Sequence, residues 1–156
     1  MDDWHLPWQG GCRCGQIRVE VAAPPLMTWA CHCNGCRRMT GSAYSLTLTI
    51  PAEGFRVTAG EPVIGGLHGA TRHYFCPRCM SWVFTRPEGL DAFVNLRAPM
   101  LDDDGWFVPY VETWRREGLP WSRTPAAHSF ETDPDDAAFA PLVAEFAERG
   151  SRPGAG

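Results

Sequence analysis

The segment Cys31-His32-Cys33-Asn34-Gly35-Cys36-Arg37-Arg38-Met39-Thr40-Gly41-Ser42 carries three of the seven cysteines of the chain. The other four form two closely spaced pairs, a C-x-C pair at Cys12 and Cys14 and a C-x-x-C pair at Cys76 and Cys79. Seven thiols cannot all pair in disulfides within one chain, and clustered reduced thiols indicate metal binding or catalysis. The opening residues lack the basic region of a secretory signal, so we expect reduced thiols in a cytoplasmic protein.

The composition is that of an ordinary globular domain. The chain has 156 residues, of which 44% are hydrophobic and 21% charged, and this length is enough to bury a core. Its 16 glycines and 14 prolines predict many turns between short strands. The net charge of −4 argues against a nucleic-acid partner. No apolar run is long enough for a membrane span, so we also expect no membrane partner.

The C-x-x-C pair has the spacing of a zinc knuckle. Two residues between the thiols allow a tight turn that directs both sulfurs at one ion, and a structural zinc ion requires four such ligands. The C-x-C pair can supply the other two, because alternate side chains of an extended segment point the same way. This grouping leaves Cys31, Cys33 and Cys36, and three protein ligands with one open position are typical of a catalytic zinc site.

The spacing also permits a different grouping. Cys33 and Cys36 form a second C-x-x-C pair, which could share one ion with Cys76 and Cys79. Cys12, Cys14 and Cys31 would then be the remaining three thiols. The spacing by itself does not choose between the two groupings, nor between an open catalytic site and a second structural metal.

Hydrophobic patterning predicts a mainly β chain. Alternating or β-rich runs predict seven strands, and residues 34–40 form one or two helical turns. Apolar residues at helical spacing predict a C-terminal helix over residues 134–149, beginning after Thr132 or Asp133. We expect an irregular lead-in before residue 10, a loop over residues 60–69, and core packing of the tryptophan-rich segment 106–121. The predicted strands are residues 17–21, 27–31, 43–50, 55–58, 71–75, 82–85 and 92–96.

Three motifs together resemble the glutathione-dependent formaldehyde-activating enzyme family, also called the GFA or CENP-V domain. They are Gly11-Cys12-Arg13-Cys14-Gly15, the quoted segment 31–42, and Phe75-Cys76-Pro77-Arg78-Cys79. The resemblance covers roughly residues 9–121 and implies the Mss4-like fold of curved antiparallel sheets. We therefore expect a zinc-binding domain over residues 1–130, a helix packed on it over 131–149, and a disordered tail over 150–156.

The same resemblance implies two zinc ions and a reaction. Four cysteines would hold the structural ion and the remaining three the catalytic one. The implied activity is that of a carbon–sulfur lyase, which joins glutathione to formaldehyde as S-hydroxymethylglutathione. One departure from the family is Met80, where a glycine is usual. The structural ligands would be Cys12, Cys14, Cys76 and Cys79, and the catalytic ligands Cys31, Cys33 and Cys36.

Two arginines follow the central cysteines directly. Guanidinium groups match carboxylates, and glutathione carries two, so Arg37 and Arg38 are candidate substrate-binding residues. We expect His32 to point away from the metal into hydrogen bonds, because it alternates with two ligands. The competing hypothesis is a zinc-binding scaffold without catalytic activity, which binds a protein or a small molecule.

Overall fold

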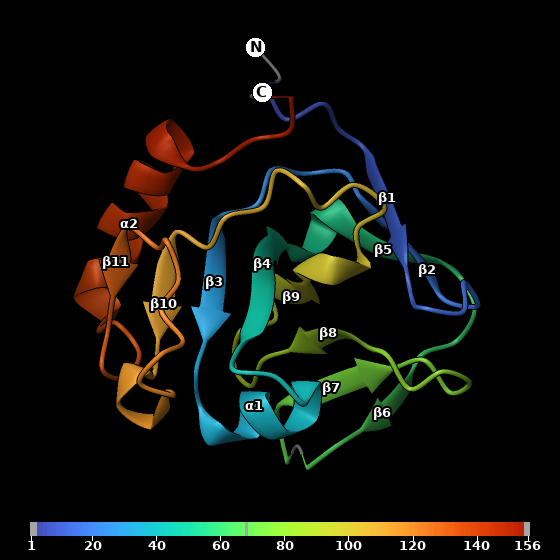
Figure 1. Cartoon of the computed structure of the whole chain (residues 1–156). Coiled ribbons are helices and arrows are strands. Elements are labelled where there is room, and N and C mark those ends of the chain that lie inside the picture. The colour runs from blue at the N-terminus through green and yellow to red at the C-terminus, as the bar shows by residue number, and fades with distance from the viewer. Residues whose placement is uncertain (1–2, 68, 155–156) are drawn as a thin grey trace.

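The computed structural model describes residues 3–67 and 69–154, which form two β-sheets with helices at the edges (Figure 1). The smaller sheet is antiparallel, in the order β1-β2-β5, with β1 at Trp8–Gly11, β2 at Arg18–Val21 and β5 at Phe55–Ala59. The larger has eight strands in the order β11-β10-β3-β4-β9-β8-β7-β6. Its strands are β3 (Met27–Cys31), β4 (Ser45–Pro51), β6 (Val63–Gly65), β7 (Arg72–Phe75), β8 (Trp82–Arg86), β9 (Phe93–Arg97), β10 (Val111–Thr113) and β11 (His128–Ser129).

Strand β4 lies near the middle of the large sheet and separates its two faces. Leu48 and Ile50 point to one face and are fully buried in the main core with residues of the small sheet such as Val19. Thr47 and Thr49 alternate with them and point to the opposite face, as the twofold period of a strand requires. These threonines are nevertheless only 5% and 6% exposed, so other parts of the chain cover the polar face as well.

The short helix α1 (Asn34–Thr40) follows β3 directly. Its N-cap is Cys33, whose sulfur accepts a hydrogen bond from the backbone N–H of Cys36. It ends at Gly41, which has a φ of 62°, a left-handed conformation that glycine adopts without strain. Two cysteines of the central segment are therefore part of the first turn of this helix, which holds their sulfurs together.

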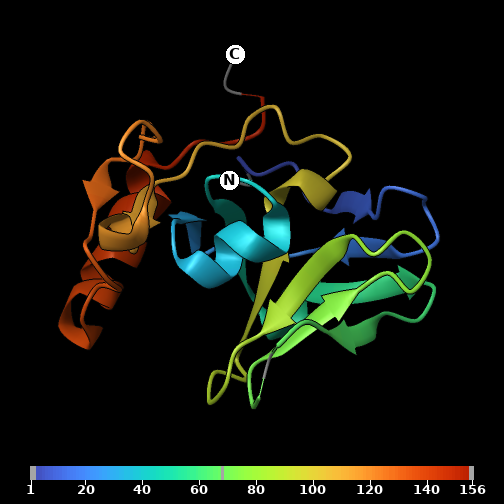
Figure 2. The same cartoon turned by 60° about the horizontal axis from the view of Figure 1, so that its bottom comes forward.

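The C-terminal helix α2 (Asp136–Arg149) packs beside β3 at one edge of the molecule, well apart from the β6–β8 strands (Figure 2). Leu142 and Phe146 are buried in a second apolar cluster with Met27 and Tyr110. The helix starts two residues later than the sequence predicts. Its cap is Asp135, whose carboxylate accepts from the Ala138 N–H at 2.8 Å, because Asp133 instead accepts from the indole N–H of Trp114.

The mainly β fold class is confirmed, with short helical segments and a C-terminal helix. The pattern missed strands where glycine-rich or aromatic sequence masks the twofold period. Residues 8–11 and 63–65 are strands rather than lead-in and loop, and the tryptophan-rich segment supplies β10. Strand β10 pairs in parallel with both β3 and β11, so the large sheet is mixed rather than wholly antiparallel. The remaining helical pieces are the turns η1 (Ala52–Gly54), η2 (Ala98–Met100) and η3 (Arg115–Glu117).

The chain end packs near the N-terminal aromatic residues. The Arg152 guanidinium lies over the Trp4 ring, 4.3 Å from its centroid, and Ser151 Oγ accepts from the Val108 N–H. Residues 155 and 156 of the predicted tail lie outside the described residues. Within the described ranges, neither helix has the length and apolar character needed to cross a membrane.

Candidate metal centres and their cavity

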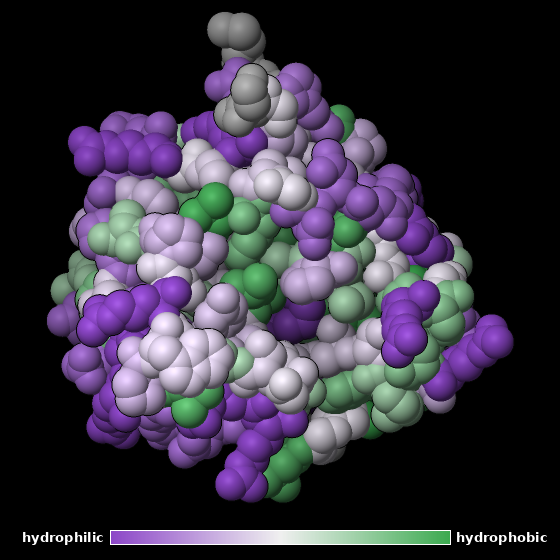
Figure 3. Space-filling view, viewed as in Figure 1, coloured by the Kyte–Doolittle hydropathy of each residue, from purple (hydrophilic) through white to green (hydrophobic). Residues whose placement is uncertain are grey.

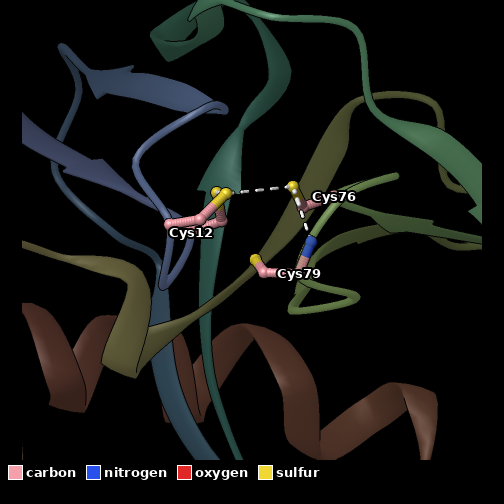
Figure 4. A group of neighbouring side chains, drawn as sticks. Cys12, Cys76 and Cys79 are labelled. Carbon is pink, nitrogen blue, oxygen red and sulfur yellow. Dashed lines mark hydrogen bonds between the residues drawn. The ribbon is translucent and has the colours of Figure 1, made fainter.

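Four cysteines from distant parts of the chain meet at one point. Cys12 and Cys14 come from the turn between β1 and β2, and Cys76 and Cys79 from the turn between β7 and β8 (Figure 4). All four sulfurs lie within 4.8 Å of one another. This cluster therefore connects an outer strand of the small sheet with the far end of the large one.

The sulfur spacing fits a tetrahedral zinc ion. A zinc–sulfur bond of about 2.3 Å separates neighbouring sulfurs of a tetrahedron by about 3.8 Å. The sulfurs of Cys12 and Cys14 are 3.6 Å apart, and those of Cys14 and Cys76 are 3.7 Å apart. Backbone N–H groups of Ile17 and Cys79 also donate to cluster sulfurs, which stabilises thiolate ligands.

Met80 directly follows this cluster in a strained conformation. Its φ is 58°, in the left-handed region, and its N–H donates to the Cys76 carbonyl at 3.0 Å to close the turn. The side chain is 59% exposed and contributes little packing. The turn thus has a backbone that favours glycine but contains methionine.

The other three cysteines gather at the start of α1. The sulfurs of Cys31, Cys33 and Cys36 lie within 4.8 Å of one another, and within the described residues no fourth His, Cys, Asp or Glu joins the group. The structure thus groups the seven sulfurs as four and three, and does not place Cys33 and Cys36 with Cys76 and Cys79.

The three thiols differ in how readily they ionise. Hydrogen bonds from Cys31 and then Cys36 lower the pKa of Cys33 to about 2, and the same bond to Cys33 raises the pKa of Cys31. Ionising all three therefore needs a cation between them. A divalent ion on three thiolates would leave a net charge of −1, and zinc fits this donor set.

His32 points away from the sulfurs into a buried ionic network. Its Nε2 donates to Glu112 Oε2 at 3.0 Å, and its Nδ1 accepts from the Arg115 guanidinium at 3.1 Å. Burial lowers the pKa of His32, which favours the neutral ring that this tautomer requires. Glu112 Oε2 also accepts from the Thr124 hydroxyl at 2.9 Å. The network fixes the backbone between Cys31 and Cys33 against β10 and η3.

A cavity of about 740 Å³ lies over the polar face of the large sheet, and Cys31 and Cys36 line it. Its floor is the row of alternate residues on β4 and β9, including Thr47, Asn95 and Arg97. Its far wall is the start of α2, where Phe139 stacks on Trp29 with ring centroids 6.3 Å apart. Helix α2 is thus one of the parts of the chain that cover the threonines of β4.

Arg97 is the one arginine among the described residues that line this cavity. It is 7% exposed and lies over the Trp82 ring, 4.1 Å from its centroid. Burial lowers the pKa of its guanidinium to about 10, while the Cys36, Cys31 and Cys33 thiolates oppose that shift. The side chain therefore keeps its positive charge at neutral pH and is placed to balance the negative three-cysteine centre.

A second cavity of about 390 Å³ lies on the other side of Arg97. Ser45, Trp82 and Arg97 line both cavities and form the wall between them. The second cavity lies between α1 and η2, where Figure 3 shows a central hollow with a strongly hydrophilic floor. The wall of three shared residues can thus be approached from two sides.

The two arginines singled out by the sequence do not line either cavity. The Arg37 guanidinium donates to Asn34 Oδ1 at 3.1 Å and to the Glu117 carbonyl at 2.8 Å, so it holds α1 against η3. Arg38 is exposed on the outer side of α1. Substrate binding by either arginine remains a prediction, whereas Arg97 is the guanidinium that lies in the cavity.

The family model for the glutathione-dependent formaldehyde-activating enzyme matches residues 7–117. The chain belongs to this family. A protein of Penicillium rubens, provisionally described as a glutathione-dependent formaldehyde-activating enzyme, is 30% identical over 108 residues, or 63% of this chain. The match spans 55% of that relative, so the chain covers about half the length of the curated protein. A crystal structure of a Rhodobacter sphaeroides protein shares the fold, with a TM-score of 0.52 and 20% identity over 60% of this chain and 87% of the other.

Sequence reasoning missed the residues that complete the site around the GFA cysteines. Ser45, Thr47 and Thr49 alternate with apolar residues, which signals a polar face of β4. Arg97 is two residues from Asn95 and therefore faces the same way on β9. No local pattern shows that α2, which lies beyond the matched residues, covers this face. Glu112 and Arg115 likewise come from a segment that the pattern assigned only to packing.

Replacing Met80 with glycine is expected to stabilise the protein. The substitution removes the cost of a left-handed non-glycine residue, about 1 kcal/mol, and loses almost no buried surface. Chemical denaturation of the zinc-loaded protein should show a higher free energy of unfolding for Met80→Gly. Met80→Ala is the matched control, since it shortens the side chain but keeps the Cβ. Equal stabilities of the two variants would show that the turn is not strained.

Removing the Glu112 carboxylate is expected to destabilise the fold strongly. Glu112→Ala leaves the His32 N–H and the Thr124 hydroxyl without their acceptor and removes the carboxylate that pairs with the Arg115 guanidinium, at a cost of about 3–5 kcal/mol. Glu112→Gln should cost less, because its amide oxygen still accepts. The exposed Glu148→Ala serves as the control in the same denaturation experiment, and a Glu112→Ala variant as stable as this control would contradict the role of the network.

Proposed function

We propose that the protein is a zinc-dependent enzyme that joins a thiol, such as glutathione, to formaldehyde or a related small aldehyde. The observation that carries this proposal is the three-cysteine cluster, which opens onto a cavity and which no fourth ligand among the described residues completes. Membership of the GFA family supports the same activity.

The overall reaction is an addition that needs no oxidant or reductant. The thiol sulfur bonds to the aldehyde carbon, the carbon–oxygen π bond breaks, and the thiol proton passes to the oxygen. A zinc ion on three thiolates supplies an open position that lowers the pKa of a bound thiol. The reverse reaction is a carbon–sulfur lyase step.

The side chains around the cavity have separate tasks in this proposal. Cys31, Cys33 and Cys36 hold the catalytic ion, and α1 fixes the last two in one helical turn. The network of His32, Glu112 and Arg115 keeps their backbone in place from behind. The four-cysteine cluster holds a second, structural ion. Arg97 holds positive charge beside the three thiolates, in a cavity that the aromatic side chains keep largely apolar.

The two cysteine groups are expected to respond differently to substitution. Cys33→Ser should reduce the zinc content from two ions to one and leave the protein folded, because serine still caps α1. Cys79→Ser should remove the ion that connects the two sheets and unfold the protein. Metal analysis and circular dichroism of both variants measure this difference. If Cys33→Ser unfolds the protein as fully as Cys79→Ser, the three-cysteine group is structural, which favours the scaffold without catalytic activity.

Exchange between formaldehyde and thiols tests the reaction itself. Two-dimensional exchange NMR should show faster interconversion of free and thiol-bound formaldehyde with zinc-loaded protein than in its absence. Cys33→Ser should remove the acceleration. Glutathione and 2-mercaptoethanol are the two thiols to compare. No acceleration with glutathione would remove that substrate, and none with either thiol would contradict the proposed activity.

A further inference from the structure

Two buried polar groups on the cavity wall lack a hydrogen-bond partner. Within the described residues, Ser45 Oγ and Arg97 Nε are the buried side-chain nitrogen and oxygen atoms without one. Leaving such a donor unpaired destabilises the folded state, and more so for a charged group. That both unpaired groups belong to the same wall indicates that an acceptor from outside the chain belongs there.

Sheet register brings these two groups together. Thr47 on β4 is directly opposite Arg97 on β9, and Ser45 is two residues from Thr47 on the same face. Ser45 and Arg97 are therefore diagonal neighbours, within reach of a long side chain. Ser45 is in turn directly opposite Cys31, so the pair lies beside the three-cysteine centre.

Two contacts fix the orientation of the Arg97 guanidinium. Its contact with the Trp82 ring fixes its plane, and one terminal nitrogen donates to the Asn95 carbonyl at a long 3.3 Å. No carboxylate among the described residues forms an ion pair with it. Its hydrogen-bonding capacity thus remains largely unused by the protein.

The rest of the cavity favours an apolar molecule. Trp29, Phe93 and Phe139 form an aromatic wall, with Phe139 in contact with both other rings. Three exposed carboxylates, Asp133, Asp135 and Asp136, lie along the rim near the start of α2. This acidic rim opposes a second negative charge on the bound molecule.

We propose that Ser45 and Arg97 form an oxyanion-binding pair, and that the substrate it serves has an aromatic or otherwise apolar body with a single anionic oxygen group. This inference rests on the proposed function only in placing the substrate in the same cavity. The pair donates to a negatively charged oxygen beside the three cysteines, whether this is a carboxylate or the aldehyde oxygen as the carbon–sulfur bond forms. The aromatic wall holds the body of the molecule.

The C-terminal segment contributes the part of this cavity that the family match does not cover. The acidic rim and Phe139 lie beyond residues 7–117, whereas the oxyanion pair and the other two aromatic residues of the wall lie within them. The bound molecule is therefore held by groups from both parts of the chain.

Binding of 3-phenylpropanoate to the zinc-loaded protein tests the pair without requiring turnover. Its neutral counterpart, 3-phenylpropanamide, has the same body and no charge. Isothermal titration should show about tenfold or tighter binding of the carboxylate, since a charged hydrogen bond contributes about 1.5–3 kcal/mol. Propanoate, which has the carboxylate but no ring, should bind more weakly than 3-phenylpropanoate.

Three variants show which side chains cause the preference for the carboxylate over the amide. Arg97→Met should remove the preference for the carboxylate over the amide while it keeps the contact with Trp82. Ser45→Ala should reduce the preference severalfold. If Arg97→Met does not fold, Ser45→Ala by itself tests the pair. Arg86→Met is the matched control, because Arg86 lies over the Phe84 ring at 6.0 Å and lines neither cavity. It should keep the full preference.

The outcomes separate this inference from the proposed function. Equal binding of carboxylate and amide, or an unchanged preference in Ser45→Ala and Arg97→Met, overturns the oxyanion pair. Binding of propanoate as tight as that of 3-phenylpropanoate overturns the apolar substrate. If carboxylate preference depends on Arg97 but formaldehyde exchange with 2-mercaptoethanol is not accelerated, the binding pair stands and the enzyme activity fails. Accelerated exchange without any carboxylate preference leaves the activity in place and removes the pair.

Discussion

The twofold alternation of β4 is the constraint on which both the core and the cavity depend. Leu48 and Ile50 contribute to the core between the two sheets, and Ser45, Thr47 and Thr49 form the floor of the cavity on the other face. A shift of one residue in register would exchange the two sets and place hydroxyl groups in the core. The neighbours of β4 transmit this register: β3 carries Cys31 and β9 carries Arg97 to the same face.

The two cysteine groups stabilise different levels of structure. Four sulfurs connect turns that lie more than sixty residues apart in the chain, so their ion would join the two sheets at that end. The three sulfurs lie within six residues, and α1 and the His32 network already hold them. A metal ion would therefore add much to folding at the first group and little at the second, which would leave the second free for chemistry.

The sequence predicted what is local or repeated along the chain. Cysteine spacing suggested the four-and-three grouping, although a second grouping was equally compatible with it. Strands such as 27–31 and 43–50 and the C-terminal helix follow from their hydrophobic periods. The parallel strand β10 was missed because its three residues are too few to show a period. Arg37 and Arg38 were singled out by proximity in sequence; they line neither cavity, and substrate binding by them stays a prediction.

Arg97 shows why a site can be incompletely visible in sequence. In the strand Phe93–Arg97 it resembles an ordinary exposed arginine at the end of a strand, and alternation places it only on a polar face. Its guanidinium packs on Trp82 and lines a cavity whose wall includes α2, which follows some forty residues later. The same helix brings Phe139 to the cavity, and the acidic rim comes from its first residue and the segment just before it. The family match ends at residue 117, so it includes both cysteine groups and Arg97, whereas the part of the cavity wall that Phe139 forms lies outside it.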